Sequence, residues 1–215
     1  MTETIRLDIF SDPVCPWCYV GKANLDRALE AHADHPFQVA WHPFQLNPDM
    51  PAEGVAKREY LTSKFGGADR VDAMHDRLRD VAREAGLPLN PDVPKRMPNT
   101  LNAHRLIHWA GVEGRQTPVV SAIFRAYWVE GRDIGNAGVL ADIGAAAGMD
   151  RDALVRLLAS DADAADILAR DADARAKGVS SVPTFLIAQH YVVSGAQPPE
   201  MWDRVIKDLA KATSI

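Results

Sequence analysis

The sequence predicts an α/β protein in which both ends of the chain build one small sheet around a large all-helical insertion. Strand-like segments occur near the two ends, at residues 6–10, 36–44 and 182–194, and helical patterns fill most of the chain between them. Residues 1–50 and 178–215 are therefore expected to form one discontinuous domain, and residues 51–177 an inserted helical domain.

The N-terminal segment alternates strand, helix and strand. Residues 6–10 have strand character and are followed by the breaker Ser11-Asp12-Pro13. A helix of about four turns is expected after Cys15, because Pro16 suits the first helical position, where a missing N–H costs nothing. Residues 36–44 alternate as a second strand and end in a turn-rich exit.

The insertion shows a series of amphipathic helical patterns with identifiable starts and stops. Asn99 is expected to cap one helix, Thr117 is expected to cap another whose first position is Pro118, and glycines stop several of them. The predicted helices span residues 69–85, 99–110, 119–130, 136–147, 150–160 and 161–177.

The last part of the chain returns to strands. Residues 182–188 and 191–194 are expected to form two strands joined by a turn at 189–190, and an apolar stripe after Pro199 predicts a final helix. A Cys-x-x-Cys pair beside such a strand-helix-strand pattern is typical of a thioredoxin-like redox fold.

Composition excludes several classes of protein. The 215 residues are 47% apolar and 25% charged, and 24 basic against 29 acidic residues give a net charge of −5, so no basic surface for nucleic acid is expected. Neither a run of about 18 apolar residues nor a signal-like N-terminus is present. These features predict a cytoplasmic protein without membrane or nucleic-acid partners.

The two cysteines of the chain, Cys15 and Cys18, enclose only Pro16 and Trp17. A disulfide across so short a ring constrains the unfolded chain little. Zinc would need two further ligands; His104 and His108 stand at i, i+4 and could share a helix face, but nothing in the sequence ties that face to the cysteines. Redox chemistry fits the context better than either alternative.

The position of each cysteine predicts its role. Unpaired backbone N–H groups at a helix N-terminus stabilise a thiolate, so Cys15 is the expected nucleophile. Cys18, one turn further along, is expected to be the more buried thiol and to resolve a mixed disulfide on Cys15. Trp17 is expected to be exposed beside Cys15 as an apolar contact for partners.

Several motifs in order resemble the DsbA family of thioredoxin-fold oxidoreductases, and more closely its cytoplasmic FrnE-like branch. They are Cys15-Pro-Trp-Cys18 within residues 11–19, residues 98–105, residues 178–185 and residues 195–197. The resemblance implies a thiol–disulfide oxidoreductase in which the Val182–Pro183 bond is cis, faces the dithiol and positions the partner, with Pro183 counted among the catalytic residues. The partners it implies are proteins or small molecules that carry thiols or disulfides.

The same branch resembles 2-hydroxychromene-2-carboxylate isomerases and kappa-class glutathione transferases, which lack an intact dithiol. The alternative function is therefore a glutathione-dependent isomerase or transferase acting on a small aromatic or polyketide-like substrate. By similarity, Asn47, Val182 and Gln197 are expected to line a glutathione or peptide site. No metal or cofactor is required, and glutathione is the co-substrate that the resemblance suggests.

A third hypothesis is a binding or chaperone-like protein that uses a cleft of the helical domain and is indifferent to both cysteines. The residue pattern leaves open the direction of electron flow, the physiological substrate and the oligomeric state, a homodimer included. It also leaves open the roles of Asp12, His104 and Arg105.

Overall fold

The computed structural model describes residues 4–212, and its centre is a four-stranded sheet in the order β2-β1-β5-β6. Strand β1 pairs with β2 in parallel and with β5 in antiparallel orientation, and β6 pairs antiparallel with β5. The two ends of the chain therefore share one sheet, as expected. The strands are β1 (Ile5–Ser11), β2 (Phe37–Pro43), β5 (Thr184–Ile187) and β6 (Tyr191–Ser194).

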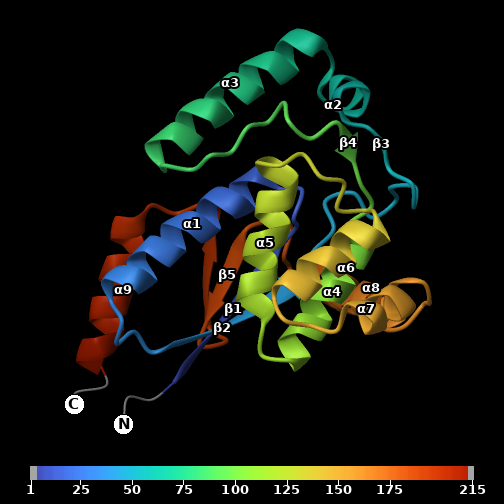
Figure 1. The fold of residues 1–215 in the computed structure, drawn as a ribbon. Coiled ribbons are helices and arrows are strands. Elements are labelled where there is room, and N and C mark those ends of the chain that lie inside the picture. Colours follow the sequence, from blue (N-terminus) through green and yellow to red (C-terminus); the bar gives the residue numbers. More distant parts are fainter. Residues whose placement is uncertain (1–3, 213–215) are drawn as a thin grey trace.

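Helices α1 (Pro16–Ala31) and α9 (Pro199–Ala212) lie side by side (Figure 1). Phe185 of β5 packs edge-on against Trp202 of α9, with 4.8 Å between the ring centroids, and both side chains are fully buried. Gly21 of α1 allows a close approach to the segment before β5, because a Cβ atom there would lie 3.0 Å from Cγ of Pro183. This packing fixes α1, which begins with the cysteines, against the start of β5.

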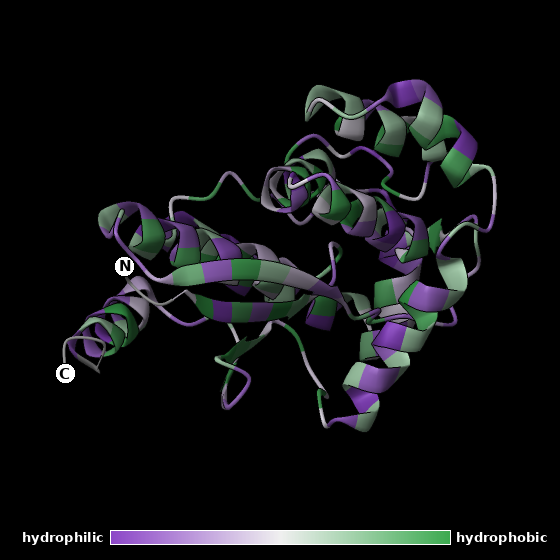
Figure 2. Ribbon diagram, turned by 90° about the horizontal axis from the view of Figure 1, so that it is seen from below, coloured by the Kyte–Doolittle hydropathy of each residue, from purple (hydrophilic) through white to green (hydrophobic). Residues whose placement is uncertain are grey.

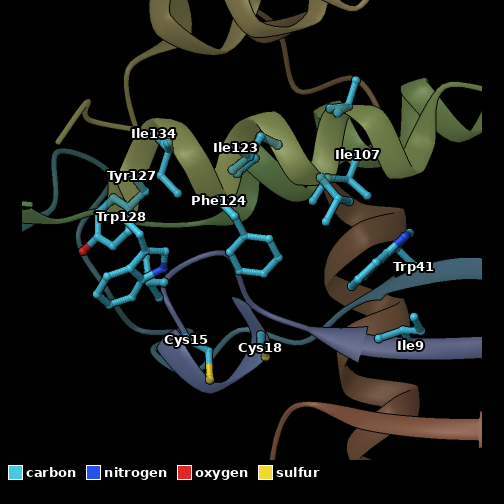
Figure 3. Packing of buried hydrophobic residues seen from close by; sticks show 14 of the residues in the cluster. Ile9, Cys15, Cys18, Trp41, Ile107, Ile123, Phe124, Tyr127, Trp128 and Ile134 are labelled. Atoms are coloured by element: carbon cyan, nitrogen blue, oxygen red, sulfur yellow. The ribbon is translucent and has the colours of Figure 1, made fainter. Parts of the chain in front are cut away.

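A second group of helices covers β2 and extends the core. Trp41 of β2 is anchored to this group, since Gln116 binds both its backbone N–H and its carbonyl oxygen, and Thr117 accepts from its indole N–H. Buried apolar residues run from the sheet into these helices without a break (Figure 3). The helices are α4 (Leu101–Val112), α5 (Gln116–Trp128), α6 (Ala137–Ala146), α7 (Arg151–Leu158) and α8 (Ala164–Ala176).

Helices α2 (Lys57–Phe65) and α3 (Ala68–Glu84) form an arch above the start of α1 (Figure 1). The chain enters and leaves this arch through two short antiparallel strands, β3 (Val55–Ala56) and β4 (Arg96–Met97). The expected all-helical insertion is therefore wrong in this detail. Two residues per strand are too few to produce an alternating pattern in the sequence.

Three expected boundaries are also wrong. Helix α4 has Thr100 as its N-cap instead of Asn99, whose side chain accepts from the Leu101 N–H. Helix α5 begins at Gln116 instead of after Thr117, because the Gln116 side chain is held by Trp41. Strand β5 begins only at Thr184, and the turn that follows it comprises residues 188–190, which include the expected turn at 189–190; residues 188 and 189 both have positive φ.

Hydrophilic and hydrophobic residues alternate along the helices (Figure 2). In α3, for example, Val71, His75, Leu78 and Ala82 are buried, at the spacing of a single helix face. Across the described residues, we found no helix with the length and apolar character needed to cross a bilayer.

Candidate functional site: the dithiol and the adjoining cavity

Cys15 and Cys18 lie at the junction between the β1 exit and α1 (Figure 3). Cys15 is the N-cap residue of α1, and Pro16 occupies the first helical position. Cys18 lies one turn further on, where its N–H donates to the Cys15 carbonyl oxygen at 3.2 Å. Both are free thiols and both are buried, Cys15 with 3% and Cys18 with 1% of its surface exposed.

The environment of Cys18 stabilises its protonated form. Burial raises the pKa of the Cys18 thiol well above its usual value, and the neighbouring Cys15 thiol raises it further. Hydrogen bonds from the Asp12 backbone and the Ser11 side chain act in the opposite direction but are outweighed. Cys18 is therefore a protonated thiol at neutral pH.

The segment before β5 faces Cys15. The Sγ atom of Cys15 lies 3.6 Å from the carbonyl oxygen of Val182, and the Val182–Pro183 peptide bond is cis. Two hydrogen bonds hold this segment in place: Thr184 Oγ1 donates to the Ser181 carbonyl, and the Gly195 N–H donates to the Pro183 carbonyl.

The loop before Cys15 is held by a buried carboxyl group. Asp12 is fully buried, and its side chain accepts from the Leu46 N–H at 2.7 Å and the Val14 N–H at 3.3 Å. Burial raises the pKa of Asp12 to about 7. The Asp12 carboxyl thus links the loop that carries Cys15 to the loop that follows β2.

His104 approaches Asp12 from α4, with Nε2 3.9 Å from Oδ1 of Asp12. Burial lowers the pKa of His104 to about 4, so the imidazole is neutral at pH 7. Within residues 4–212 its Nε2 atom has no hydrogen-bond partner. His104 therefore packs behind the Cys15 loop, away from the surface.

A cavity of about 360 Å³ opens beside Cys15. Its walls come from the start of α1, the loop after β2, the arch of α2 and α3 with Pro91 and Met97 after it, Trp128 at the end of α5, and the segment before β5. This volume lies within the range of small-molecule sites in proteins. Its lining includes Cys15, Trp17, Asn47, Lys57, His75 and Val182.

The structure brings most of the predicted site residues together. Cys15, Trp17, Asn47 and Val182 all line this cavity, and Trp17 is 37% exposed, as expected. Asn47 accepts hydrogen bonds from the Tyr60 hydroxyl at 2.6 Å and from Lys64 Nζ at 2.7 Å.

Gln197 lies apart from these residues. It does not line the cavity beside Cys15; its side chain donates to the Ser194 carbonyl at 2.7 Å, and its own carbonyl accepts from the Asn24 side chain at 2.9 Å. Its role in substrate binding stays a prediction.

Arg105 and His108 have structural partners instead. The buried Arg105 guanidinium donates at 2.7 Å to the carbonyl oxygens of Leu157, Ser160 and Ala162, which satisfies acceptors at and beyond the end of α7. The His108 ring is hydrogen-bonded to the Arg170 guanidinium, with 3.1 Å between Nδ1 of His108 and Nη1 of Arg170. Arg105 therefore stabilises the fold. The two histidines of α4 have different neighbours, Asp12 beside His104 and Arg170 beside His108.

Sequence reasoning missed the wall that α2 contributes. Lys57, Tyr60, Leu61, Lys64 and Phe65 all line the cavity, at positions i, i+3, i+4, i+7 and i+8 of one helix face. This spacing was a usable signal. The two lysines in this stripe made it look hydrophilic, because lysine side chains are usually exposed to solvent.

A thioredoxin-type sheet with a Cys-x-x-Cys pair at the start of its first helix defines the class of this protein. The model of the DSBA-like thioredoxin domain matches residues 6–207. The chain therefore belongs to the DsbA-like thioredoxin family.

Solved structures agree with this assignment. A probable DsbA oxidoreductase from Streptomyces coelicolor is 30% identical, with a TM-score of 0.85 over 96% of this chain and 90% of that chain. A 2-hydroxychromene-2-carboxylate isomerase is 18% identical, with a TM-score of 0.74 over 97% and 98% of the two chains. The cytosolic disulfide reductase DsbM from Pseudomonas aeruginosa, also solved with GSH, is 21% identical, with a TM-score of 0.70 over 96% and 99%. The last two show the shared fold alone.

Proposed function

We propose that this protein is a thiol–disulfide oxidoreductase of the FrnE-like branch, with Cys15 as nucleophile and Cys18 as resolving thiol. The observation that carries the proposal is the asymmetry of the pair. Cys15 caps α1, lines the open cavity and lies 3.6 Å from the Val182 carbonyl, whereas Cys18 lies one turn deeper and does not line that cavity.

The reaction has two exchange steps. The Cys15 thiolate attacks one sulfur of a substrate disulfide, a mixed disulfide forms, and the first substrate thiolate leaves. Cys18 then loses its proton and attacks Sγ of Cys15, which releases the second substrate thiolate. The Cys15–Cys18 pair is thereby oxidised to a disulfide while the substrate is reduced by two electrons, and the reverse sequence oxidises a substrate dithiol.

The raised pKa of Cys18 suits the resolving role. A protonated, buried Cys18 does not compete with Cys15 for the substrate disulfide. Because Cys18 is shielded from solvent, it attacks the mixed disulfide on Cys15 from the interior of the protein. The two sulfurs of one motif therefore act in a fixed order.

The groups around Cys15 are arranged to bind the partner. The Val182 carbonyl is directed at Cys15 and can accept an N–H from an extended substrate, in the manner of strand addition. Pro183 packs against Gly21 and so holds this segment, and Trp17 offers a partly exposed aromatic surface in the same cavity. Residues 1–50 and 178–215 supply the dithiol and residues 51–177 supply the α2–α3 wall.

The alternative is a glutathione-dependent isomerase or transferase acting on a small aromatic or polyketide-like substrate. The observations that favour it are the cavity beside Cys15, the isomerase among the structural neighbours, and the neighbour solved with GSH. Turnover that survives Cys18→Ser but requires glutathione would support the alternative. In the oxidoreductase, glutathione is one small-thiol co-substrate, no other cofactor is needed, and the site of action is the cytoplasm.

The test is a redox titration of the whole protein in glutathione buffers of increasing oxidised fraction, with the thiols counted by alkylation and intact mass. The expected result is a single two-electron transition in which both thiols are lost together. Cys15→Ser should abolish this transition. A wild-type dithiol that stays reduced across the full range of buffers would overturn the proposal.

A further inference from the structure

One end of the cavity contains a lysine that is almost fully buried. Lys57 of α2 is 4% exposed, and its Nζ atom donates to the Pro91 carbonyl at 2.7 Å. The ammonium also lies over the Trp128 ring, 4.7 Å from its centroid. An ammonium group has three N–H donors, and the Pro91 carbonyl accepts from one of them. The Lys57 ammonium can therefore donate to a further acceptor, such as an atom of a bound ligand.

No carboxylate neutralises this ammonium. Within residues 4–212, no Asp or Glu oxygen lies within 4.0 Å of Lys57 Nζ. The nearby Asp92 is bound to His75 at 2.9 Å and also to Arg79. A buried charge without a partner ion is costly, and burial lowers the pKa of Lys57 to about 8.

The charge of the cavity contrasts with that of the chain. The protein carries more acidic than basic residues, yet the described cavity lining includes Lys57 and Lys64 and no aspartate or glutamate. Lys64 stands nearer the solvent, where Tyr60 and Asn47 hold it. A ligand that enters this cavity therefore meets positive charge only.

Most of the remaining lining is apolar, although Asn47, Tyr60, His75, Ser180 and Ser181 also contribute to it. Leu61, Phe65, Met74, Leu78 and Met97 supply side chains without hydrogen-bonding groups, apart from the thioether sulfurs. Such walls favour flat or branched apolar groups, which gain free energy when they leave water.

We propose that Lys57 binds the carboxylate or phenolate of an apolar organic acid in this cavity, and that such acids, carrying a thiol or disulfide within reach of Cys15, are the substrate class of this protein. Only one part of this inference rests on the proposed function, namely that the sulfur of the substrate reacts with Cys15. The anion site itself rests on the buried ammonium and on a mostly apolar lining that contains no aspartate or glutamate.

The test compares two probes of the same shape, 2-naphthoate and the neutral 2-naphthamide, by titration calorimetry on the full chain. Wild-type protein should bind the carboxylate at least about tenfold more tightly than the amide, which is about 1.4 kcal/mol. Lys57→Met should abolish this preference and Lys57→Arg should keep most of it. The exposed lysine variant Lys177→Met is the matched control and should behave as wild type.

Equal binding of the two probes to wild-type protein would overturn the proposal without any variant, so a poorly folded Lys57→Met does not weaken the test. A preference that Lys57→Met retains would also overturn it. Bound naphthoate should slow alkylation of Cys15, and unchanged alkylation would place the probe elsewhere and refute the site. None of these measurements uses disulfide turnover, so failure of the anion site and failure of the exchange reaction give different results.

Discussion

The Sγ atom of Cys15 lies 3.6 Å from the carbonyl oxygen of Val182, although 167 positions separate the two residues in the sequence. The contact joins the start of α1 to the segment before β5, and so depends on the sheet that both ends of the chain build. It places the carbonyl that we propose to bind an extended substrate beside the proposed nucleophile.

Replacing Gly21 by alanine should disturb the contact between Cys15 and Val182. A Cβ atom at this position would lie 3.0 Å from Cγ of Pro183 and 3.4 Å from Cα of Ala196, and neither a proline ring nor backbone moves easily. We expect a loss of about 1–3 kcal/mol in the free energy of unfolding and slower exchange with glutathione disulfide.

The control is Gly138→Ala in α6, where the new methyl group approaches only Oδ1 of the exposed Asn136 side chain, at 3.2 Å. It should cost less stability and leave exchange at the wild-type rate. Urea unfolding and stopped-flow exchange measure the two effects. Equal behaviour of the two variants would contradict the assigned packing of α1 against Pro183.

Arg105→Lys should destabilise the fold without changing the chemistry of the dithiol. The guanidinium donates four hydrogen bonds, to Asn102 and to three backbone carbonyls, and a lysine cannot reproduce this fork. Leaving buried acceptors unpaired should lower the free energy of unfolding by about 2–4 kcal/mol.

Urea unfolding measures this loss, and the exposed Arg156→Lys on α7 serves as control. Exchange rates of the folded fraction should match wild type. A variant that stays as stable as wild type but loses exchange activity would show instead that Arg105 serves the site.

Asp12→Asn should change how stability depends on pH. The pKa of Asp12 is raised to about 7 in the folded protein from an ordinary value of 3.8, so the folded state binds a proton that the unfolded state releases. Its contribution to stability is therefore fully present below pH 4 and is lost as the pH rises from about 4 to about 7.

The stability of wild type relative to Asp12→Asn should fall across this window, by a few kcal/mol at most. Urea denaturation of both proteins at pH 4.5, 6 and 7.5 measures the difference. His104 does not confound the comparison to first order, because it is present in both proteins. A difference that is constant with pH, or that grows with rising pH, would show that the Asp12 carboxyl is ionised in the folded protein.

Local sequence features predicted the centre of the site well. The strand-to-helix junction is determined by residues close together in the chain: a breaker that precedes Cys15 and a proline, Pro16, that follows it. Cys15 was therefore expected at the N-terminus of α1, and the structure places it there. The sheet built from both ends also followed from short strand patterns. The approach of Val182 to Cys15 came from family resemblance, since no local pattern links residues so far apart.

Other features depend on tertiary packing and could not be read from the chain. Lys57 is a common surface residue type, and only the packing of α2 over Trp128 and Pro91 buries it. The sequence left the role of Asp12 open; the fold buries its carboxyl group, and this burial raises its pKa although the hydrogen bond from the Leu46 N–H acts in the opposite direction. Helix α5 begins early because Gln116 binds Trp41, a contact between segments 75 residues apart.

The most direct test of the central claim is the trapping of mixed disulfides by the two single-cysteine variants. Each protein is reduced, treated with glutathione disulfide and analysed by intact mass under acid quench. Cys18→Ser should accumulate the glutathione adduct on Cys15, because the resolving thiol is absent, while Cys15→Ser should remain almost unmodified because Cys18 is buried and protonated. Equal labelling of the two variants, or faster labelling of Cys15→Ser, would contradict the separate roles assigned to the two sulfurs.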